Sequence, residues 1–203
     1  MQDQWVGDEG DLLKFGLLRH LIEHGGDAIN PLGVNWYYRP PAKGVGMDRV
    51  FDTALLDAMR PIRSVAHVET SKLLDERTVF FTEAVPNLKR QRPEWQSRAV
   101  DALGNCQAIF LDPDNGLQPK NAKPAHVLWR ELEFWHKAGK TVIVFQHARR
   151  SATADVDIAE EIREKLKSAV APMWVRRKSR WMYVIPATGR ASEISKLMTL
   201  FEK

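Results

Sequence analysis

Apolar residues recur along this chain with two different spacings, one typical of helices and one typical of buried strands. Leu13, Leu17 and Leu21 stand four residues apart, which predicts an amphipathic helix over residues 11–24. Residues 141–145 instead form a short continuous run, Thr-Val-Ile-Val-Phe, as in a strand that is buried on both faces. Segments of the two kinds alternate, and this alternation favours a sheet covered by helices.

The full pattern predicts an α/β fold. Further helices are expected at residues 48–60, 93–103, 124–138, 155–170 and 191–201. Further strands are expected at residues 34–38, 64–68, 79–82, 108–111, 173–175 and 181–185. The last two strands are too close together for a crossover helix, so they should pair as an antiparallel hairpin. We therefore expect one domain over residues 1–203 with a doubly wound, mostly parallel, seven-stranded Rossmann-like sheet and a C-terminal antiparallel hairpin.

Composition narrows the class of protein only a little. The 203 residues are 44% hydrophobic, enough for a full core, and Cys106 is the single cysteine. The start of the chain lacks a signal-peptide pattern, and no apolar run approaches the roughly 20 residues that span a bilayer. We therefore expect a cytoplasmic protein without a membrane partner. A net charge of +4 is compatible with DNA or RNA as a partner, and nothing indicates the oligomeric state.

A polar segment directly follows the predicted strand 108–111 and reads Asp112-Pro113-Asp114-Asn115-Gly116. Ligands of open parallel sheets bind beyond the carboxyl ends of the strands, where this segment should lie. It could be a tight turn capped by Asp112, since Asn-Gly pairs favour turns. We favour a ligand site, because loops with several polar groups at this edge commonly bind something.

The same segment resembles the Asp-Pro-Pro-Tyr motif of adenine-N6 methyltransferases. In that family the aspartate and a proline carbonyl accept hydrogen bonds from the adenine amino group, and the aromatic residue stacks on the flipped base. Asp112 and Pro113 match, whereas Asp114 and Asn115 replace the second proline and the aromatic residue. The resemblance implies that these four residues and a base lie together. Because Asn115 cannot stack, another aromatic residue would have to do so, or the substrate is not an adenine.

Residues 6–18 resemble the opening of the family that methylates an adenine of large-subunit ribosomal RNA. Gly7, Asp11, Leu13 and Lys14 match that opening in order. In that family the segment folds over the cofactor pocket and its lysine lies near the methyl donor. The resemblance therefore implies S-adenosylmethionine as cofactor, with Asp11 and Lys14 beside it. The alternative is a capped amphipathic helix whose lysine is solvated.

Two further features bear on a cofactor. Glu69 follows the predicted strand 64–68, where an acidic residue binds ribose hydroxyls in Rossmann-like sheets. Methyltransferases have a glycine-rich turn after the first strand, but here two prolines occupy the turn and the glycines come later, at Gly44 and Gly46. The chain is also similar over nearly its full length to a group of bacterial proteins that share the Gly-Asp-x-Gly-Asp opening and the Asp-Pro-Asp-Asn-Gly loop, a similarity that implies no activity.

Basic residues gather in segments that should reach the same edge of the sheet. His147 follows the strand 141–145 and could relay a proton or bind a phosphate, or could be structural. The first basic group follows the third predicted strand and contains Lys89, Arg90 and Arg92. The second follows the fifth strand and contains Arg149 and Arg150. The third lies in the hairpin and contains Arg176, Arg177, Lys178 and Arg180. Trp95, Trp174 and Trp181 lie in or near them. Such a rim suits nucleic acid, although solvated charges around core tryptophans would give the same pattern.

Three functions remain open at this point. The first is a methyltransferase-like protein that acts on or binds nucleic acid, with adenine N6 as a candidate target. The second is a metal-dependent nuclease or phosphoryl-transfer enzyme in which Asp112 and Asp114 hold Mg²⁺, since paired carboxylates suit hard cations. The third is a non-catalytic member of the fold that binds nucleic acid or a protein. Apart from the second reading, no metal site is expected.

Overall fold

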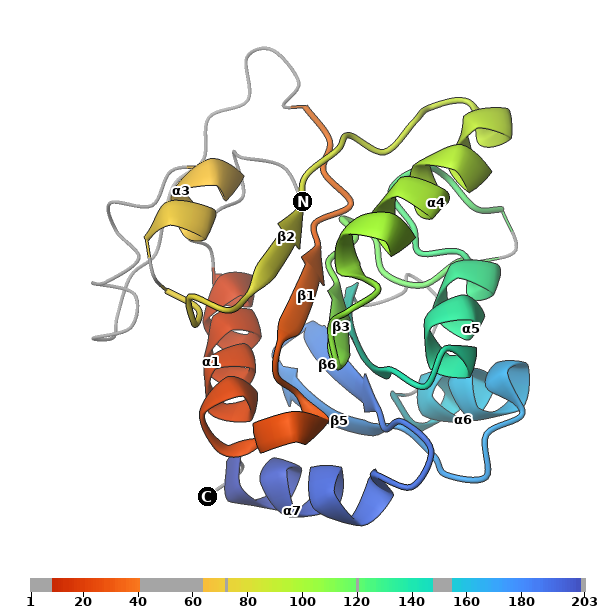
Figure 1. Cartoon of the computed structure of the whole chain (residues 1–203). Helices are drawn as coiled ribbons and strands as arrows, with labels where there is room; N and C mark the ends of the chain where they lie inside the picture. The colour runs from red at the N-terminus through yellow and green to blue at the C-terminus, as the bar shows by residue number, and fades with distance from the viewer. Residues whose placement is uncertain (1–8, 41–63, 72, 120, 148–154, 202–203) are drawn as a thin grey trace.

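The computed structural model describes residues 9–40, 64–71, 73–119, 121–147 and 155–201. The strands of this part form one mixed sheet in the order β2-β1-β3-β4-β6-β5 (Figure 1). Their bounds are β1 Leu32–Asn35, β2 Val79–Phe81, β3 Ala108–Leu111, β4 Thr141–His147, β5 Met173–Arg177 and β6 Arg180–Ile185. Strands β2, β1, β3 and β4 are parallel, while β6 is antiparallel to both β4 and β5.

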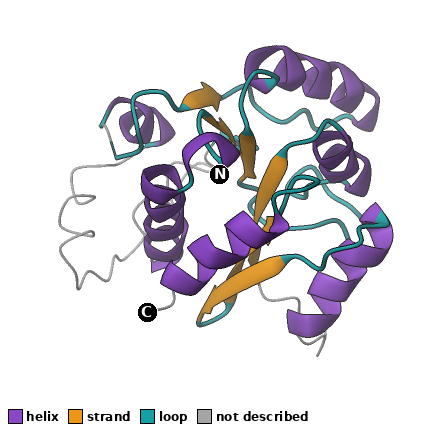
Figure 2. Cartoon of the chain, turned by 60° about the horizontal axis from the view of Figure 1, so that its bottom comes forward, coloured by secondary structure: helices purple, strands orange, loops and turns teal. Residues whose placement is uncertain are grey.

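Helices cover both faces of the sheet. Their bounds are α1 Glu9–His24, α3 Val65–Thr70, α4 Arg92–Leu103, α5 Trp129–Lys137, α6 Asp155–Leu166 and α7 Ala191–Phe201, with 3-10 turns η2 Gly26–Ala28 and η3 Lys89–Gln91. One buried cluster joins the sheet to α1, α3 and α7, and a second joins it to α4, α5 and α6. Figures 1 and 2 show the strands between these two groups of helices. The predicted α/β class is therefore confirmed, whereas the sheet is mixed and not the expected mostly parallel Rossmann-like sheet.

The apolar runs of the central strands follow from this layering. In β3, Phe110 packs toward α1, whereas Ile109 and Leu111 pack toward α4 and α5. In β4, Ile143 and Val144 divide between the two faces in the same way. Successive side chains of a strand point to opposite faces, and here helices cover both faces. The residues of these strands are therefore apolar at successive positions instead of alternating with polar ones.

The C-terminal hairpin is also confirmed. Met173 to Arg177 pairs antiparallel with Arg180 to Ile185, and the register sets Arg177 opposite Arg180. On its other side, Arg180 lies opposite His147, the last residue of β4. The turn of the hairpin therefore lies at the carboxyl edge of the parallel strands.

One predicted strand is wrong. Residues 65–68 belong to α3 and Ser64 is its N-cap, and within the described ranges the sheet has six strands, not seven. The Ser64 hydroxyl caps this helix by accepting a hydrogen bond from the His67 backbone N–H. Val65 and Val68 are both buried and stand three residues apart, so they form one face of a helical turn. A short apolar run with this spacing fits either element, and packing decided it.

Other boundaries differ by smaller amounts. Helix α5 begins at Trp129 and not near residue 124, because the backbone before it pairs in a parallel bridge between Leu117 and Val127. Helix α6 ends at Leu166, short of the expected residue 170. The helix expected at residues 48–60 lies outside the described residues. In the part of the chain that is described, no helix is both long and apolar enough to cross a membrane.

Candidate functional site

Asp112 lies at the topological switch point of the sheet, where the order in which the chain adds strands reverses. The chain runs from β1 to β2 on one side of β1 and reaches β3 on the other, so β1 and β3 flank the switch point. The Asp112 backbone N–H donates to the Asn35 carbonyl at the end of β1, over 3.0 Å. Crevices at such switch points are the usual ligand sites of open α/β sheets.

Three charged side chains meet at this point and form a cluster of Asp11, Lys14 and Asp112. Lys14 Nζ lies 3.0 Å from Asp112 Oδ1, 3.1 Å from its Oδ2 and 2.9 Å from Asp11 Oδ1. The same ammonium lies 4.5 Å from the centre of the Phe145 ring, within range of a cation–π contact. All three charged residues are at most 4% exposed. The cluster thus brings two carboxylates to one ammonium.

The environment of Asp112 favours its protonated form more than water does. Burial raises the pKa of this carboxyl above its ordinary value, the Lys14 ammonium acts against that rise, and Asp114 adds to it. Desolvation therefore outweighs the ion pair. Perturbed carboxyls at the ligand edge of a sheet are candidates for functional groups.

The rest of the Asp-Pro-Asp-Asn-Gly loop is held by contacts of several kinds. Pro113 is buried, Asp114 lies 3.7 Å from the Arg39 guanidinium, and Asn115 is exposed. The Asn115 backbone N–H donates to the Ala125 carbonyl. The backbone of the loop is thus tied to the segment before α5, while the Asp112 carboxylate contacts Lys14 on α1.

Gly116 and Gln146 join this loop to β4. The Leu117 backbone N–H donates to Gln146 Oε1 over 2.7 Å. Gly116 has φ +81°, and a Cβ atom at this position would overlap the Gln146 side-chain amide. A residue other than glycine would meet both a strained backbone and a steric clash.

The end of β1 has bulky residues where a glycine-rich turn was considered. Trp36 and Tyr37 are fully buried, and Tyr37 adopts φ +47°, a conformation that glycine takes most easily. Gly44 and Gly46 lie outside the described residues. Glu69 belongs to α3, so it does not follow a strand; its Oε1 accepts a hydrogen bond from Trp36 Nε1 over 3.0 Å, and burial raises its pKa.

A second buried network lies on the opposite face of the sheet and was not predicted. Arg92 donates through Nε and Nη2 to the two Glu131 oxygens, over 2.7 and 2.9 Å. The Tyr37 hydroxyl donates to Glu131 Oε2 over 2.9 Å, and burial, followed by Glu131, raises the pKa of Tyr37 well above its ordinary value. Arg92 also donates to the carbonyls of Pro124 and His126. This network ties the backbone before α5 to α4 and β1.

The predicted basic rim is present only in part. Arg90, Arg177 and Lys178 are exposed, whereas Arg149 and Arg150 lie outside the described residues. His147 is half-buried, and its ring lies 4.9 Å from that of Phe145, edge to face.

Three residues assigned to the rim have other roles. Arg92 is buried in the network with Glu131, and Trp95 and Trp181 are core residues at most 5% exposed. They cannot offer a face to a base. Arg92 can lie in the apolar core because Glu131, 39 residues away, and the carbonyls of Pro124 and His126 accept hydrogen bonds from its guanidinium.

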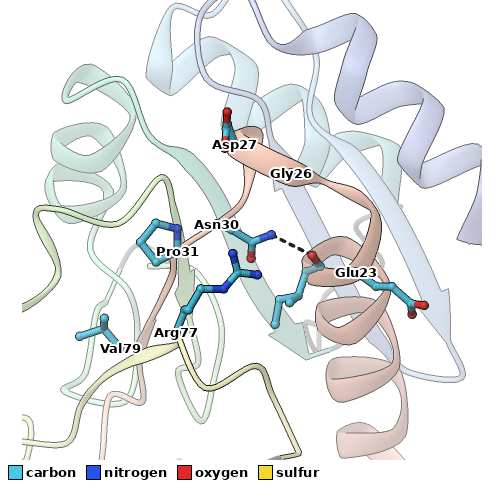
Figure 3. Close-up of a pocket in the computed structure, with 8 residues that line it drawn as sticks. Glu23, Gly26, Asp27, Asn30, Pro31, Arg77 and Val79 are labelled. Atoms are coloured by element: carbon cyan, nitrogen blue, oxygen red, sulfur yellow. Dashed lines mark hydrogen bonds between the residues drawn. The ribbon is translucent and has the colours of Figure 1, made fainter.

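A hollow at the other edge of the sheet is not part of this site. It has a volume of about 490 Å³ and lies at the amino ends of β1 and β2 (Figure 3). Glu23, Asp27, Asn30 and Arg77 are among the residues that line it. The Asn30 amide donates to the Ile22 carbonyl over 2.8 Å, and Arg77 is paired with Asp75.

The described residues offer little to a metal ion. No group of three histidine, cysteine or acidic side chains in these ranges is placed to hold one. Asp112 and Asp114, the ligands considered for Mg²⁺, each face a basic side chain, Lys14 and Arg39. No protein-family model, no curated protein and no solved structure matches this chain.

Proposed function

We propose that this chain is a methyltransferase-like protein that acts on nucleic acid, with an amino group of a base, such as adenine N6, as its target. The observation that carries the proposal is the contact between Lys14 and Asp112. The motif resemblances assign one residue to the methyl donor and the other to the target amine, so both should lie beside one reaction centre. They are 98 residues apart in the chain, and their side chains meet at the switch point of the sheet.

The strand order supports the same proposal. Four parallel strands are followed by an antiparallel hairpin whose second strand, β6, lies between β4 and β5. A terminal antiparallel hairpin is the feature that distinguishes the methyltransferase-like sheet from many other doubly wound folds. The exposed Arg90, Arg177 and Lys178 add positive charge that suits a phosphate backbone.

The donor set fits S-adenosylmethionine. When bound, this cofactor supplies a methyl group on a positively charged sulfonium and carries an amino acid end. Asp11 and Asp112 are buried carboxylates that would suit the cationic groups of this ligand, and the Lys14 ammonium lies beside both. Lys14 would hold the carboxylate of the ligand, and Asp112 would accept a hydrogen bond from the target amine. Lys14 retains Asp11 as a partner when Asp112 turns to a ligand.

Titration calorimetry of the full chain with S-adenosylmethionine and S-adenosylhomocysteine tests the proposal. We expect heat from both ligands, and at least tenfold weaker binding in Lys14→Gln and Asp112→Asn, each checked for folding by circular dichroism. Lys137→Gln is the matched control, because Lys137 is an exposed lysine on α5 paired with Glu133. The absence of heat at millimolar ligand with the wild-type chain would contradict the proposal.

A second candidate is a non-catalytic nucleic-acid-binding member of the fold. The observation that favours it is the end of β1, where the buried Trp36 and Tyr37 replace a glycine-rich approach to a cofactor. This candidate predicts that the chain binds an oligonucleotide but gives no heat with either adenosyl ligand. Asp112→Asn would then leave oligonucleotide binding unchanged.

A further inference from the structure

A hollow of about 500 Å³ lies on the α4 and α5 side of the sheet and shares no lining residue with the Asp11–Lys14–Asp112 cluster. Its walls come from the segments that follow β2 and β3 and from the first turn of α5 (upper right in Figure 1). The residues that matter here are Pro86, Lys89, Gln118, Lys123, Trp129 and Arg130. Ligand sites commonly have volumes of about 300–1,000 Å³.

The charges around this hollow are all of one sign. Lys89, Lys123 and Arg130 are exposed and line it, and no aspartate or glutamate does. Among the described residues, none of these three cations has an acidic side chain within ion-pair distance, in contrast to Arg92 below them, which Glu131 neutralises. Unpaired cations around a concave surface produce a positive potential that attracts an anion.

One wall of the hollow offers a flat apolar surface. Trp129 is half-buried, and its ring packs partly against the core cluster of α4, α5 and α6. Its backbone N–H donates to Gln118 Oε1 over 3.1 Å, which joins the start of α5 to the loop after β3. The bond holds the backbone at Trp129, the core cluster supports the side chain, and a tryptophan that lines a hollow can stack on a base.

We propose that this hollow binds a nucleoside phosphate, with the base on Trp129 and the phosphate between Lys89, Lys123 and Arg130. The ligand source we favour is one nucleotide of a single-stranded DNA or RNA, because the exposed Arg90 extends the positive surface beyond the hollow. The proposal does not depend on methyl transfer. The proposed site lies at the same edge of the sheet as Asp112 but on the opposite face, beside α4 and α5.

Fluorescence anisotropy with end-labelled ten-nucleotide oligothymidine and oligouridine tests the site in the full chain. We expect Lys123→Glu to weaken binding at least tenfold. Lys196→Glu is the matched control, because Lys196 is an exposed lysine on α7 and its replacement changes the net charge by the same amount. We expect less than a threefold effect from the control. Equal weakening by the two variants would overturn the proposal, because it would indicate attraction by net charge alone.

Two further measurements separate stacking from charge and identify the ligand source. Trp129→Leu should weaken binding at least fivefold without changing the salt dependence, whereas Lys123→Ala should reduce the salt slope by about 0.7. An unchanged affinity in a folded Trp129→Leu variant would overturn the proposal. Displacement of the labelled oligonucleotide by millimolar AMP would indicate that the hollow binds free nucleotides. Oligonucleotide binding that AMP does not weaken would indicate that the ligand is a nucleic-acid strand. Heat with S-adenosylhomocysteine should be unaffected by these variants, so this site and the cofactor site can fail separately.

Discussion

Lys14 on α1 and Asp112 after β3 form a buried ion pair in which one ammonium contacts both oxygens of the carboxylate, at 3.0 and 3.1 Å. The pair fastens the first helix to the carboxyl edge of the central strand. Burying two charges is costly, and the mutual attraction offsets that cost only while both partners are present. The effects of removing either partner follow from this relationship.

Replacing Lys14 by methionine should destabilise the protein strongly at neutral pH. The variant removes the Lys14 ammonium from two buried carboxylates, and the loss of one partner of a buried ion pair costs about 3–5 kcal/mol. Urea unfolding followed by circular dichroism measures the change. The control, Lys137→Met, removes an exposed lysine paired with Glu133 and should cost less than about 1 kcal/mol. Similar losses in the two variants would show that the buried pair has no special role.

The stability difference between wild type and Asp112→Asn should depend on pH in a defined direction. Burial raises the pKa of Asp112 in the folded state above its unfolded value, so the native protein binds the proton more tightly than the unfolded chain does. The contribution of this group is therefore fully present below the unfolded pKa and is lost as the pH rises through the folded pKa. Denaturant unfolding of both proteins between pH 3 and pH 7 should show the wild type losing stability relative to the variant as the pH rises, and a gain would contradict the assignment.

Changing Glu131 of α5 to glutamine should lower the free energy of unfolding far more than the same change at Glu133. Glu131 is buried and accepts both arms of Arg92, so Glu131→Gln leaves a buried guanidinium without its counter-charge and should cost about 3–5 kcal/mol. Glu133 is 41% exposed and pairs with the exposed Lys137, so Glu133→Gln should cost less than about 1 kcal/mol. Thermal and urea unfolding of the pair compares them directly.

Two glycines with positive φ should also differ in how much stability the protein loses when each is replaced by alanine. Gly116→Ala forces a strained backbone and places a Cβ against the Gln146 amide, whereas Gly139, at φ +76°, has open space where its Cβ would lie. We expect about 1–2 kcal/mol from backbone strain at Gly139 and about 1–3 kcal/mol more at Gly116. Equal losses in urea unfolding would mean that the loop after β3 moves freely away from β4.

Much of the fold could be predicted from local pattern. Strand β3 was predicted at its observed bounds, because Ala-Ile-Phe-Leu is a short apolar run bounded by polar residues. The hairpin was predicted from the length of the gap between its strands, which leaves no room for a crossover. The segment 64–68 could not be assigned this way, since two valines three residues apart and a serine suit a capped turn as well as a strand.

The candidate site was predicted less completely. Asp112 and Lys14 could each be identified from their motifs, but their contact depends on how α1 packs across β3. No pattern near Arg92 in the sequence indicates its partner Glu131, so the basic residues around it predict a surface rim where the structure has a buried arginine. Trp129 was not singled out, because nothing around it in the sequence indicates that it borders a hollow.

The sequence by itself determined which segments are buried on two faces and where a loop must carry polar groups to the edge of the sheet, since hydrophobic period and turn chemistry act over a few residues. Only the tertiary structure decided which charges neutralise one another and which remain open to a ligand. Lys14 became a buried partner of Asp112, while Lys123 stayed exposed without an ion-pair partner among the described residues. The strength of a charge–charge contact depends on distance and burial, and both are set by elements far apart in the chain.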